Sequence, residues 1–278
     1  MRKDLKPECK YYVDYSVTME DVEFAYCHNE TLTGYVIRND RENKELIVVL
    51  GDNVLGRLPW SEVTIKALST KYPKKRDVPD QIAFLAAKNI RVKVTKITED
   101  GIMLSRKANM LEAWNEISKR PKDFIYTSAF LNANSAGTML FYDIGDGIVA
   151  ACNLYEFTNS RVEVNEWLSY GEVHKMVILK KNPENYVIEV SRKQACQKNY
   201  KDFKPLDIVD VKIGKPVKDD ANKIEGYRVE VTPLVDGIAL LPYDGPKRFR
   251  YGKIVKACVR KVKPSRPEGG PTINLQIL

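Results

Sequence analysis

Alternating basic and aromatic side chains near the end of the sequence form the pattern best suited to ligand binding. Residues 247–253 read Lys-Arg-Phe-Arg-Tyr-Gly-Lys. Aromatic rings can stack on nucleobases while Lys and Arg attract phosphates, so this composition suits a flexible polyanion. On a strand, Arg248 and Arg250 would share one face, and Phe249 and Tyr251 would share the other. The alternation fits a binding groove, and it also fits charged residues that face outward over a buried aromatic pair.

The distribution of charge supports a polyanion contact in the same region. The chain carries 45 Lys and Arg against 37 Asp and Glu, a net charge of +8. The last part of the chain, residues 201–278, holds 16 of these basic residues and 10 of the acidic ones. Nine basic residues and no acidic one lie between positions 247 and 266, and Lys253 and Lys256 are among them. Such a surface attracts a polyanion, or it is simply solvated.

Signatures of catalysis and of cofactor binding are absent or weak. The two histidines, His28 and His174, do not lie in a recognisable catalytic motif. Residues 145–150, Gly-Asp-Gly-Ile-Val-Ala, match a dinucleotide-binding pattern, but that pattern requires a following helix and this segment has strand character. An Asp-Gly pair between two apolar runs predicts a hairpin turn instead. We therefore expect a non-catalytic protein without a cofactor.

Cysteine spacing and hydropathy limit the remaining classes. Five cysteines at wide, irregular intervals predict free thiols, and the absence of a Cys-x-x-Cys pair argues against a metal site. Apolar runs are far shorter than the roughly 20 residues of a membrane-spanning helix. The first residues, Met-Arg-Lys-Asp-Leu-Lys, are charged and do not resemble a signal peptide. We expect a soluble, cytoplasmic protein without a membrane partner.

Short apolar stretches separated by turn residues dominate the sequence. Their spacing of about eight to twelve residues is typical of β-barrels and β-sandwiches. The strands that we predict are Leu46–Leu50, Ile90–Ile97, Gly101–Leu104, Thr138–Ile144, Gly147–Cys152, Lys175–Leu179, Tyr186–Val190, Tyr227–Val231 and Ile254–Val262. Helical spacing is confined to Met110–Ile117, which Pro121 terminates, and to Pro79–Ala87.

A weak internal repeat divides the chain. Ile102–Lys107 reads Ile-Met-Leu-Ser-Arg-Lys, and Ile188–Lys193 reads Ile-Glu-Val-Ser-Arg-Lys, 86 residues later. Residues 273–277 repeat the apolar alternation without the Ser-Arg-Lys ending. Repeats of this length, each with about five strands, predict one small barrel apiece.

The first repeat resembles the S1 RNA-binding domain, a five-stranded OB-fold family named after a ribosomal protein. The residues that carry the resemblance are Gly34-Tyr35-Val36, the turn Gly56-Arg57-Leu58-Pro59-Trp60-Ser61-Glu62 and the closing Leu104-Ser105-Arg106-Lys107. The second copy keeps Gly137-Thr138-Met139 and Ser191-Arg192-Lys193, and the third keeps Gly226–Val231 and Gly237–Pro242.

The resemblance implies a mostly β fold of three tandem five-stranded OB-type barrels with short linking helices. The domains that we expect are an N-terminal extension (1–29), barrel 1 (30–108), a linker helix (109–122), barrel 2 (123–196) and barrel 3 (197–278). It implies a non-catalytic binder of single-stranded RNA, or of single-stranded DNA, associated with translation or RNA metabolism. The alternative is a structural or assembly protein that uses its barrels for protein contacts, in a ribosome or a viral particle.

The resemblance also implies where RNA would bind. The family stacks bases on an aromatic residue just before the valine of the second strand, and we place this position at Ile47, at Ile148, and at Arg228 with Tyr227 beside it. Trp60 lies in a turn, where it serves as a stacking platform or as a hydrophobic plug of the barrel. The complete set of predicted RNA contacts is Trp60, Lys93, Arg106, Arg192, Tyr227, Arg228, Arg248, Phe249, Arg250, Tyr251, Lys253 and Lys256.

Overall fold

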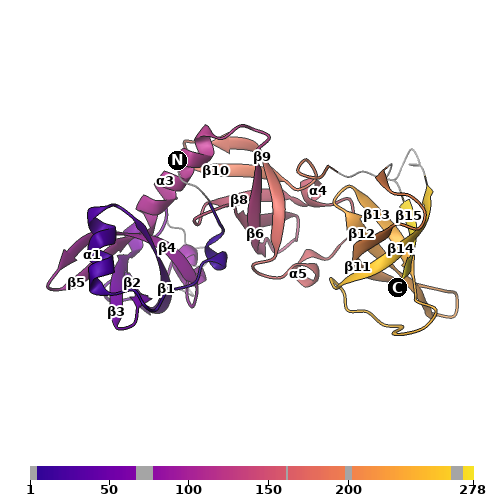
Figure 1. Cartoon of the computed structure of the whole chain (residues 1–278), viewed down its shortest axis with the longest axis horizontal. Coiled ribbons are helices and arrows are strands. Elements are labelled where there is room, and N and C mark those ends of the chain that lie inside the picture. Colours follow the sequence, from indigo (N-terminus) through magenta and orange to yellow (C-terminus); the bar gives the residue numbers. More distant parts are fainter. Residues whose placement is uncertain (1–4, 67–77, 161, 198–201, 264–271) are drawn as a thin grey trace.

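The computed structural model describes residues 5–66, 78–160, 162–197, 202–263 and 272–278. These residues form three closed β-barrels that follow one another along the chain and lie in a row (Figure 1). In each described barrel the first strand pairs with the second and the fourth, and the third pairs with the fifth. This order fits OB-type domains, so the predicted fold class is confirmed.

Each barrel takes five consecutive strands of the chain. Barrel 1 consists of β1 (Thr31–Asp40), β2 (Glu45–Gly51), β3 (Val54–Pro59), β4 (Asn89–Thr98) and β5 (Gly101–Ser105). Barrel 2 consists of β6 (Ile125–Ala133), β7 (Met139–Asp143), β8 (Val149–Asn153), β9 (Val173–Asn182) and β10 (Val187–Ser191). Barrel 3 consists of β11 (Ile208–Lys218), β12 (Ile224–Thr232), β13 (Val235–Leu240), β14 (Ile254–Lys263) and β15 (Thr272–Ile277).

The helices are short and lie between strands or between barrels. They are η1 (Glu8–Lys10), α1 (Met19–Cys27), η2 (Trp60–Glu62), α2 (Asp80–Phe84), α3 (Arg106–Lys119), α4 (Leu154–Phe157) and α5 (Val164–Trp167). The predicted helices over Met110–Ile117 and Pro79–Ala87 overlap α3 and α2. Within the described residues, no helix is long and apolar enough to cross a membrane.

All nine predicted strands overlap observed ones, but the predicted ranges do not include six of the described strands, namely β1, β3, β6, β11, β13 and β15. In β11 the pairing register with β12 shifts between Ile213 and Pro216, and Gly214 lies inside that irregular stretch. Proline cannot donate a hydrogen bond to a neighbouring strand, and glycine weakens the apolar pattern of a strand. For this reason β11 is hard to recognise from the sequence. The β6 strand alternates less cleanly because Ala129 and Phe130 are buried side by side.

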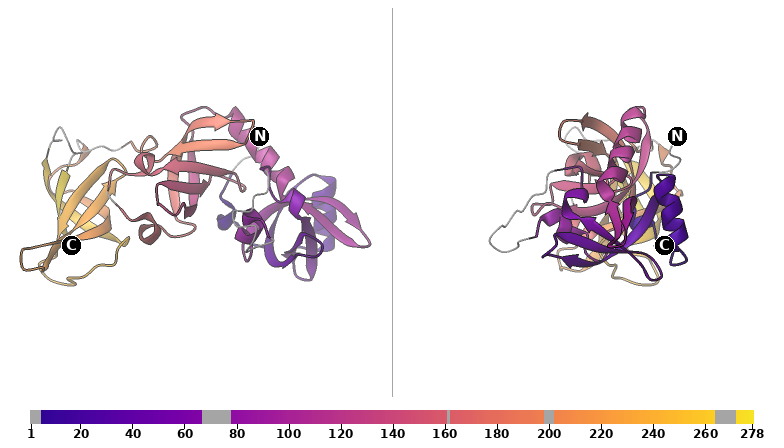
Figure 2. Two further views of the ribbon diagram at one scale, coloured as in Figure 1. Left: turned by 180° about the vertical axis from the view of Figure 1, so that it is seen from behind. Right: turned by 90° about the vertical axis from the view of Figure 1, so that its left-hand side faces the viewer.

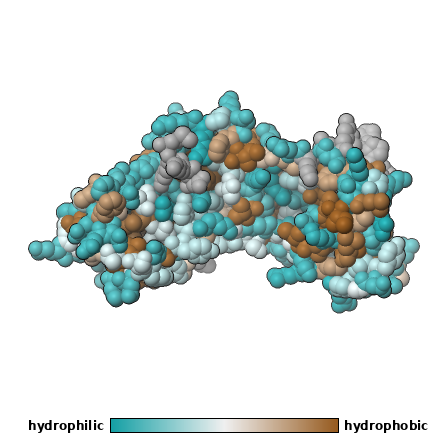
Figure 3. Space-filling model, viewed as in Figure 1, coloured by the Kyte–Doolittle hydropathy of each residue, from teal (hydrophilic) through white to brown (hydrophobic). Residues whose placement is uncertain are grey.

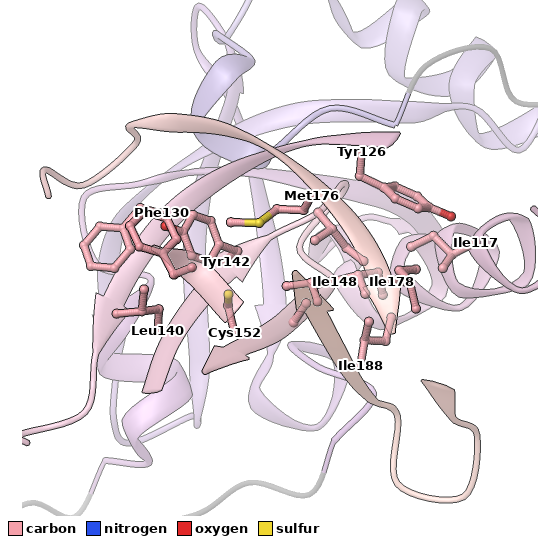
Figure 4. Packing of buried hydrophobic residues seen from close by; sticks show 14 of the residues in the cluster. Ile117, Tyr126, Phe130, Leu140, Tyr142, Ile148, Cys152, Met176, Ile178 and Ile188 are labelled. Atoms are coloured by element: carbon pink, nitrogen blue, oxygen red, sulfur yellow. The ribbon is translucent and has the colours of Figure 1, made fainter. Parts of the chain in front are cut away.

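The linker helix α3 packs into the core of barrel 2. Ser105 caps it, because the Ser105 Oγ accepts a hydrogen bond from the Ala108 N–H at 2.9 Å. Its buried face contributes Trp114 and Ile117 to the apolar cluster of barrel 2, where the Trp114 ring meets Tyr186 edge to face. Figure 4 shows Ile117 beside the strand residues of this core. Helix α3, which directly follows β5 of barrel 1, therefore connects barrel 1 to the core of barrel 2.

The N-terminal residues 5–11 form a strap, here called the N-terminal strap, across both barrels. Leu5 is buried in the apolar cluster of barrel 2. The Glu8 N–H donates to Asp143 Oδ2 of β7 at 2.6 Å. At the other end of the strap, the Asn89 side chain of β4 donates to the Tyr11 carbonyl at 2.8 Å. The strap therefore fastens barrel 1 to barrel 2.

Barrel 3 docks against barrel 2 through polar contacts. The Arg192 guanidinium reaches Glu230 of β12 at 2.8 Å. The Trp167 indole N–H donates to the Ile213 carbonyl at 3.2 Å, and Tyr251 accepts from the Glu163 N–H at 2.7 Å. The view from behind in Figure 2 shows the same row of three barrels. These contacts hold the two barrels together without a continuous apolar core.

Candidate nucleic-acid interface

The outward-facing position of the second strand can be matched across the three barrels by strand register. In each barrel an inward residue of the second strand pairs with a small residue of the third: Val48 with Gly56, Tyr142 with Ala150, and Val229 with Gly237. Because side chains alternate along a strand, the residue just before each inward residue faces outward. The equivalent outward residues are Ile47, Phe141 and Arg228.

The predicted assignment of this position to Ile148 is wrong. Ile148 is 1% exposed and lies in the turn between β7 and β8, where its N–H donates to the Gly145 carbonyl at 3.0 Å. The predicted turn at Asp146-Gly147 is confirmed, with φ of 50° and 80° at these two residues. The second strand of the barrel, β7, is the first strand of the β7–β8 hairpin and precedes this turn, so the predicted turn itself could have moved the assignment back to β7. The half-buried Phe141 occupies the position.

A cavity of about 490 Å³ opens beside Phe141, between barrels 1 and 2; we call it the barrel 1–2 cleft. Barrel 2 lines it with Phe141 and Val149 of its second and third strands, and with Tyr170 from the loop before β9. Barrel 1 lines the opposite side with Phe84 and Lys88. The face of strands two and three is where OB-type barrels bind oligonucleotides, and the volume falls within the roughly 300–1,000 Å³ of ligand sites.

Lys88 provides a cation at the edge of the barrel 1–2 cleft. Its Nζ lies 3.1 Å from the ring centroid of Phe84 and 4.5 Å from that of Tyr170. Burial lowers the pKa of Lys88 to about 8, so the amine still carries its charge at neutral pH. Burial also raises the pKa of Tyr170 to about 12, which keeps its hydroxyl neutral. Aromatic rings and the amines of Lys66 and Lys88 therefore line the same opening, together with the acidic side chains of Glu8, Asp80 and Asp143.

A buried ionic cluster closes the inner end of the cleft. The Arg106 guanidinium donates to both Glu8 carboxylate oxygens, at 2.9 and 2.7 Å. Asp143 accepts from the Glu8 and Gly145 N–H groups. Burial, together with the negative charge of Glu8, raises the pKa of Asp143 to about 7. Arg106 is 6% exposed and its guanidinium is paired with Glu8, so it is not accessible to an RNA phosphate, contrary to its predicted role.

Three other predicted contact residues are also engaged inside the protein. Lys93 is 4% exposed, donates to the Asn29 carbonyl at 2.7 Å and forms an ion pair with Glu112 of α3. Arg192 forms the ion pair that docks barrel 3. Tyr227 is buried, and its hydroxyl accepts from the Phe249 N–H at 3.1 Å. These side chains stabilise the barrels and their junctions, and they offer no open surface to RNA.

Trp60 has a mixed environment. It begins η2 at the end of β3, and its indole N–H donates to the Asn39 side chain at 3.1 Å. Its ring packs partly against the core of barrel 1. Of the two roles predicted for it, these contacts favour the hydrophobic plug. Arg57 of β3 forms an ion pair with Glu45 of β2, in which its Nε lies 2.8 Å from the Glu45 Oε1.

The basic and aromatic run of barrel 3 is a loop between β13 and β14, not a strand. The predicted alternation nevertheless holds, because Arg248 and Arg250 are exposed whereas Phe249 and Tyr251 are partly buried. Phe249 packs against the core of barrel 3, and Tyr251 packs against that of barrel 2. The two aromatic residues therefore anchor the loop, and its two arginines project from it.

The remaining basic candidates lie on exposed strand surfaces. Lys253 directly precedes β14, Lys256 lies within β14, and Arg228 lies on β12; all three are exposed. Lys256 is paired with Asp210 of β11 at 3.1 Å. Positions 264–266, which complete the basic run predicted from the sequence, lie outside the described residues. Among the described residues, no group of three or more His, Cys, Asp or Glu side chains is arranged to hold a metal ion.

The fold and the cleft define a chain of three docked OB-type barrels with an aromatic opening between the first two. No family model matches the chain, and no curated protein matches it. Among solved structures, it is similar to a multidomain protein with nucleic acid binding domains from Streptococcus pneumoniae TIGR4, with 12% identity and a TM-score of 0.29. The alignment covers 90% of this chain and 73% of that one. A likeness this distant is no guide to what the present chain binds.

Proposed function

We propose that the chain is a non-catalytic protein that binds single-stranded RNA, with bases in the barrel 1–2 cleft. The observation that carries the proposal is the position of Phe141. It occupies the outward site of the second strand, where the S1 resemblance implies a stacking ring, and it opens into a cavity with Tyr170 and Lys88. Single-strand binders combine such rings with basic side chains that follow the phosphates.

Barrel 3 supplies the basic part of the proposed surface. Arg248 and Arg250 project from a loop that Tyr251 fixes against barrel 2. Residues 163–170 of barrel 2 link this loop to the cleft, since the Glu163 N–H contacts Tyr251 and Tyr170 lines the cleft. We therefore infer a path in which bases enter the cleft and the phosphates further along reach the two arginines.

Fluorescence anisotropy with labelled single-stranded RNA, single-stranded DNA and duplex tests the proposal. Stacking contributes about 1–3 kcal/mol per base. Phe141→Leu, which keeps an apolar side chain but removes the ring, should therefore raise Kd for single-stranded RNA by about 5- to 150-fold. Tyr155→Leu is the matched control, because Tyr155 is an 83% exposed ring of the same barrel outside the cleft.

The second arm of the experiment measures charge. Each phosphate contact to a single strand contributes about −0.7 to the slope of log K against log salt. Arg248→Glu with Arg250→Glu should weaken binding and make this slope shallower by about 1.4 or more. The proposal fails if no single-stranded RNA binds at about 50 mM salt, or if neither Phe141→Leu nor the double reversal changes affinity.

A structural or assembly role, with the ribosome or another protein assembly as partner, is the second candidate function. Exposed aliphatic side chains on barrel 3, described below, favour it. A partner protein that co-purifies without nucleic acid would support this role, whereas a high 260/280 nm absorbance ratio would support RNA binding.

A further inference from the structure

The outer surface of β11 and β14 in barrel 3 carries aliphatic side chains that the fold leaves exposed. Ile208 is 63% exposed, Ile254 is 62% exposed, and Leu206, just before β11, is 74% exposed. Figure 3 shows apolar side chains gathered on the side of barrel 3 that faces the viewer. Single exposed aliphatic residues are common on protein surfaces, but several on one sheet face mark an interaction site.

The strand register places a pair of opposite charges between these aliphatic residues. On this face β11 and β14 run antiparallel, and Ile208 lies opposite Cys258, Asp210 opposite Lys256, and Lys212 opposite Ile254. Ile208 and Ile254 therefore occupy diagonal corners around the central Asp210–Lys256 pair. That pair is well exposed, since its side chains keep 64% and 67% of their surface. We call this surface the β11–β14 face.

We infer that the β11–β14 face binds a second copy of the same chain. The reason is that the face is complementary to itself. A twofold axis that lies in the interface, parallel to the strands and between them, brings β11 of one copy opposite β14 of the other. Asp210 of each copy then faces Lys256 of its partner, so two ion pairs form across the interface. The same rotation places Ile208 of each copy over Cys258 of the other copy, and Ile254 over Lys212.

Other occupants fit the face less well. A nucleic acid would find one acidic and one basic side chain at the centre, which together give no net attraction for phosphates. The strand-two and strand-three surface of barrel 3, which carries Arg228, is a different part of the barrel, because β12 and β13 lie on the other side of β11. The inference uses neither the barrel 1–2 cleft nor Arg248 and Arg250, so it does not rest on the proposed RNA binding.

Sedimentation equilibrium of the full chain tests the inference directly. The protein should be treated with nuclease and freed of nucleic acid beforehand, so that RNA cannot bridge two copies. We expect a reversible monomer–dimer equilibrium in the wild type. Ile208→Asp should raise the dimer Kd by about tenfold or more, because it removes an apolar contact and places an extra charge at the interface. The matched control is Leu55→Asp, on the 50% exposed Leu55 of β3 in barrel 1, and it should leave the equilibrium unchanged.

A charge-exchange experiment separates contact between copies from contact within one copy. Asp210→Lys alone places like charges opposite each other in the dimer, and so does Lys256→Asp alone. Each single variant should therefore be monomeric. An equimolar mixture of the two should form a heterodimer, because each changed residue then meets an opposite charge on the other chain. Circular dichroism melting of both variants confirms that they are folded.

Two results would overturn the inference, and a third would overturn the twofold arrangement. A wild-type chain that stays monomeric at its highest soluble concentration overturns it. A dimer that survives Ile208→Asp must use another surface, which also overturns it. If the mixed single variants remain monomeric while the wild type dimerises, the Asp210–Lys256 exchange is wrong and so is the proposed twofold arrangement.

Discussion

Replacing Arg106 with methionine would remove a buried charge from the joint between barrels 1 and 2. The guanidinium binds both Glu8 oxygens, and its Nη1 donates to the Val63 carbonyl at 2.8 Å. Methionine preserves much of the apolar stem but leaves the Glu8 carboxylate buried without its cation. The perturbation therefore acts on one ion pair that connects the N-terminal strap to α3.

The expected loss follows from the burial of both partners. The side chains of Arg106 and Glu8 each keep 8% of their surface. Breaking a buried ion pair by deleting one partner costs about 3–5 kcal/mol, because the remaining charge stays desolvated. A typical domain is stable by about 5–15 kcal/mol in total. The free energy of unfolding of the joined barrels should therefore fall by a large fraction.

The loss should also depend on pH through Asp143. The positive charge of Arg106 works against the burial and the Glu8 charge that raise the pKa of Asp143 to about 7. Without Arg106 this pKa rises further, so the folded state of the variant binds a proton more tightly than the unfolded state does. Such a group favours folding at low pH, and its contribution is lost as pH rises through its folded pKa. The cost of Arg106→Met should be smaller near about pH 5 than near about pH 8.

Guanidinium denaturation followed by tryptophan fluorescence measures this effect. Trp60 belongs to barrel 1 and Trp114 to α3, so both report on the joined barrels. Lys107→Met is the matched control, because it removes a charge from the next residue of the same helix. Adding Glu8→Gln to Arg106→Met should recover part of the loss. A cost below about 1 kcal/mol, or one that does not vary with pH, would refute the assignment of a buried ion pair.

Two further predictions concern the titrating groups of barrel 2. Because the pKa of Asp143 is raised to about 7, its contribution to wild-type stability should be lost as pH rises from about 4 to about 7. Asp143→Asn should flatten this part of a melting-temperature profile, and an unchanged slope would contradict the shift. Burial works to raise the pKa of Glu172, but hydrogen bonds from His174 and Lys212 outweigh it and hold the pKa at about 2. Glu172→Gln should therefore lower the free energy of unfolding by about 1–3 kcal/mol at neutral pH, and by less as pH falls below about 4. Urea denaturation followed by the fluorescence of Trp167, at the barrel 2–3 junction, measures this loss.

The strands that sequence reasoning located are those whose patterns are local. Leu46–Leu50 is a continuous apolar run, and Ile254–Val262 is rich in apolar residues. The two segments lie in β2 and β14. The Asp146-Gly147 turn was equally clear. Hydrophobic periodicity and turn chemistry depend on neighbouring residues, so a single sequence is sufficient to find them.

The candidate site was harder to predict because its residues come together only in the folded chain. Phe141 was missed through an error of register: the second strand of barrel 2 was placed after its hairpin turn. Tyr170 and Lys88 belong to different barrels, and only the docking of barrel 1 on barrel 2 brings them within reach of each other. Composition pointed to the basic loop of barrel 3, yet it carried no information on the cleft.

The recurrent Ser-Arg-Lys ending has a physical role that its sequence could not reveal. In both copies the serine caps the segment that follows, through an N–H of Ala108 at 2.9 Å and of Gln194 at 3.0 Å. In both copies the arginine turns inward to a glutamate that is distant in sequence, namely Glu8 for Arg106 and Glu230 for Arg192. A repeat ending in this way joins one barrel to its neighbour.

Under the proposed function, this joint would change how the three barrels act on one RNA strand. Barrels on flexible linkers raise affinity through effective concentration, which falls as the linkers lengthen. Here α3, the strap and the two arginine–glutamate pairs fix the barrels before any ligand arrives, so little conformational freedom is left to lose on binding. An RNA strand bound in the proposed way, across the cleft and the Arg248–Arg250 loop, would meet a surface whose spacing is already set. Preorganisation, rather than linker length, then determines how strongly the two contacts reinforce each other.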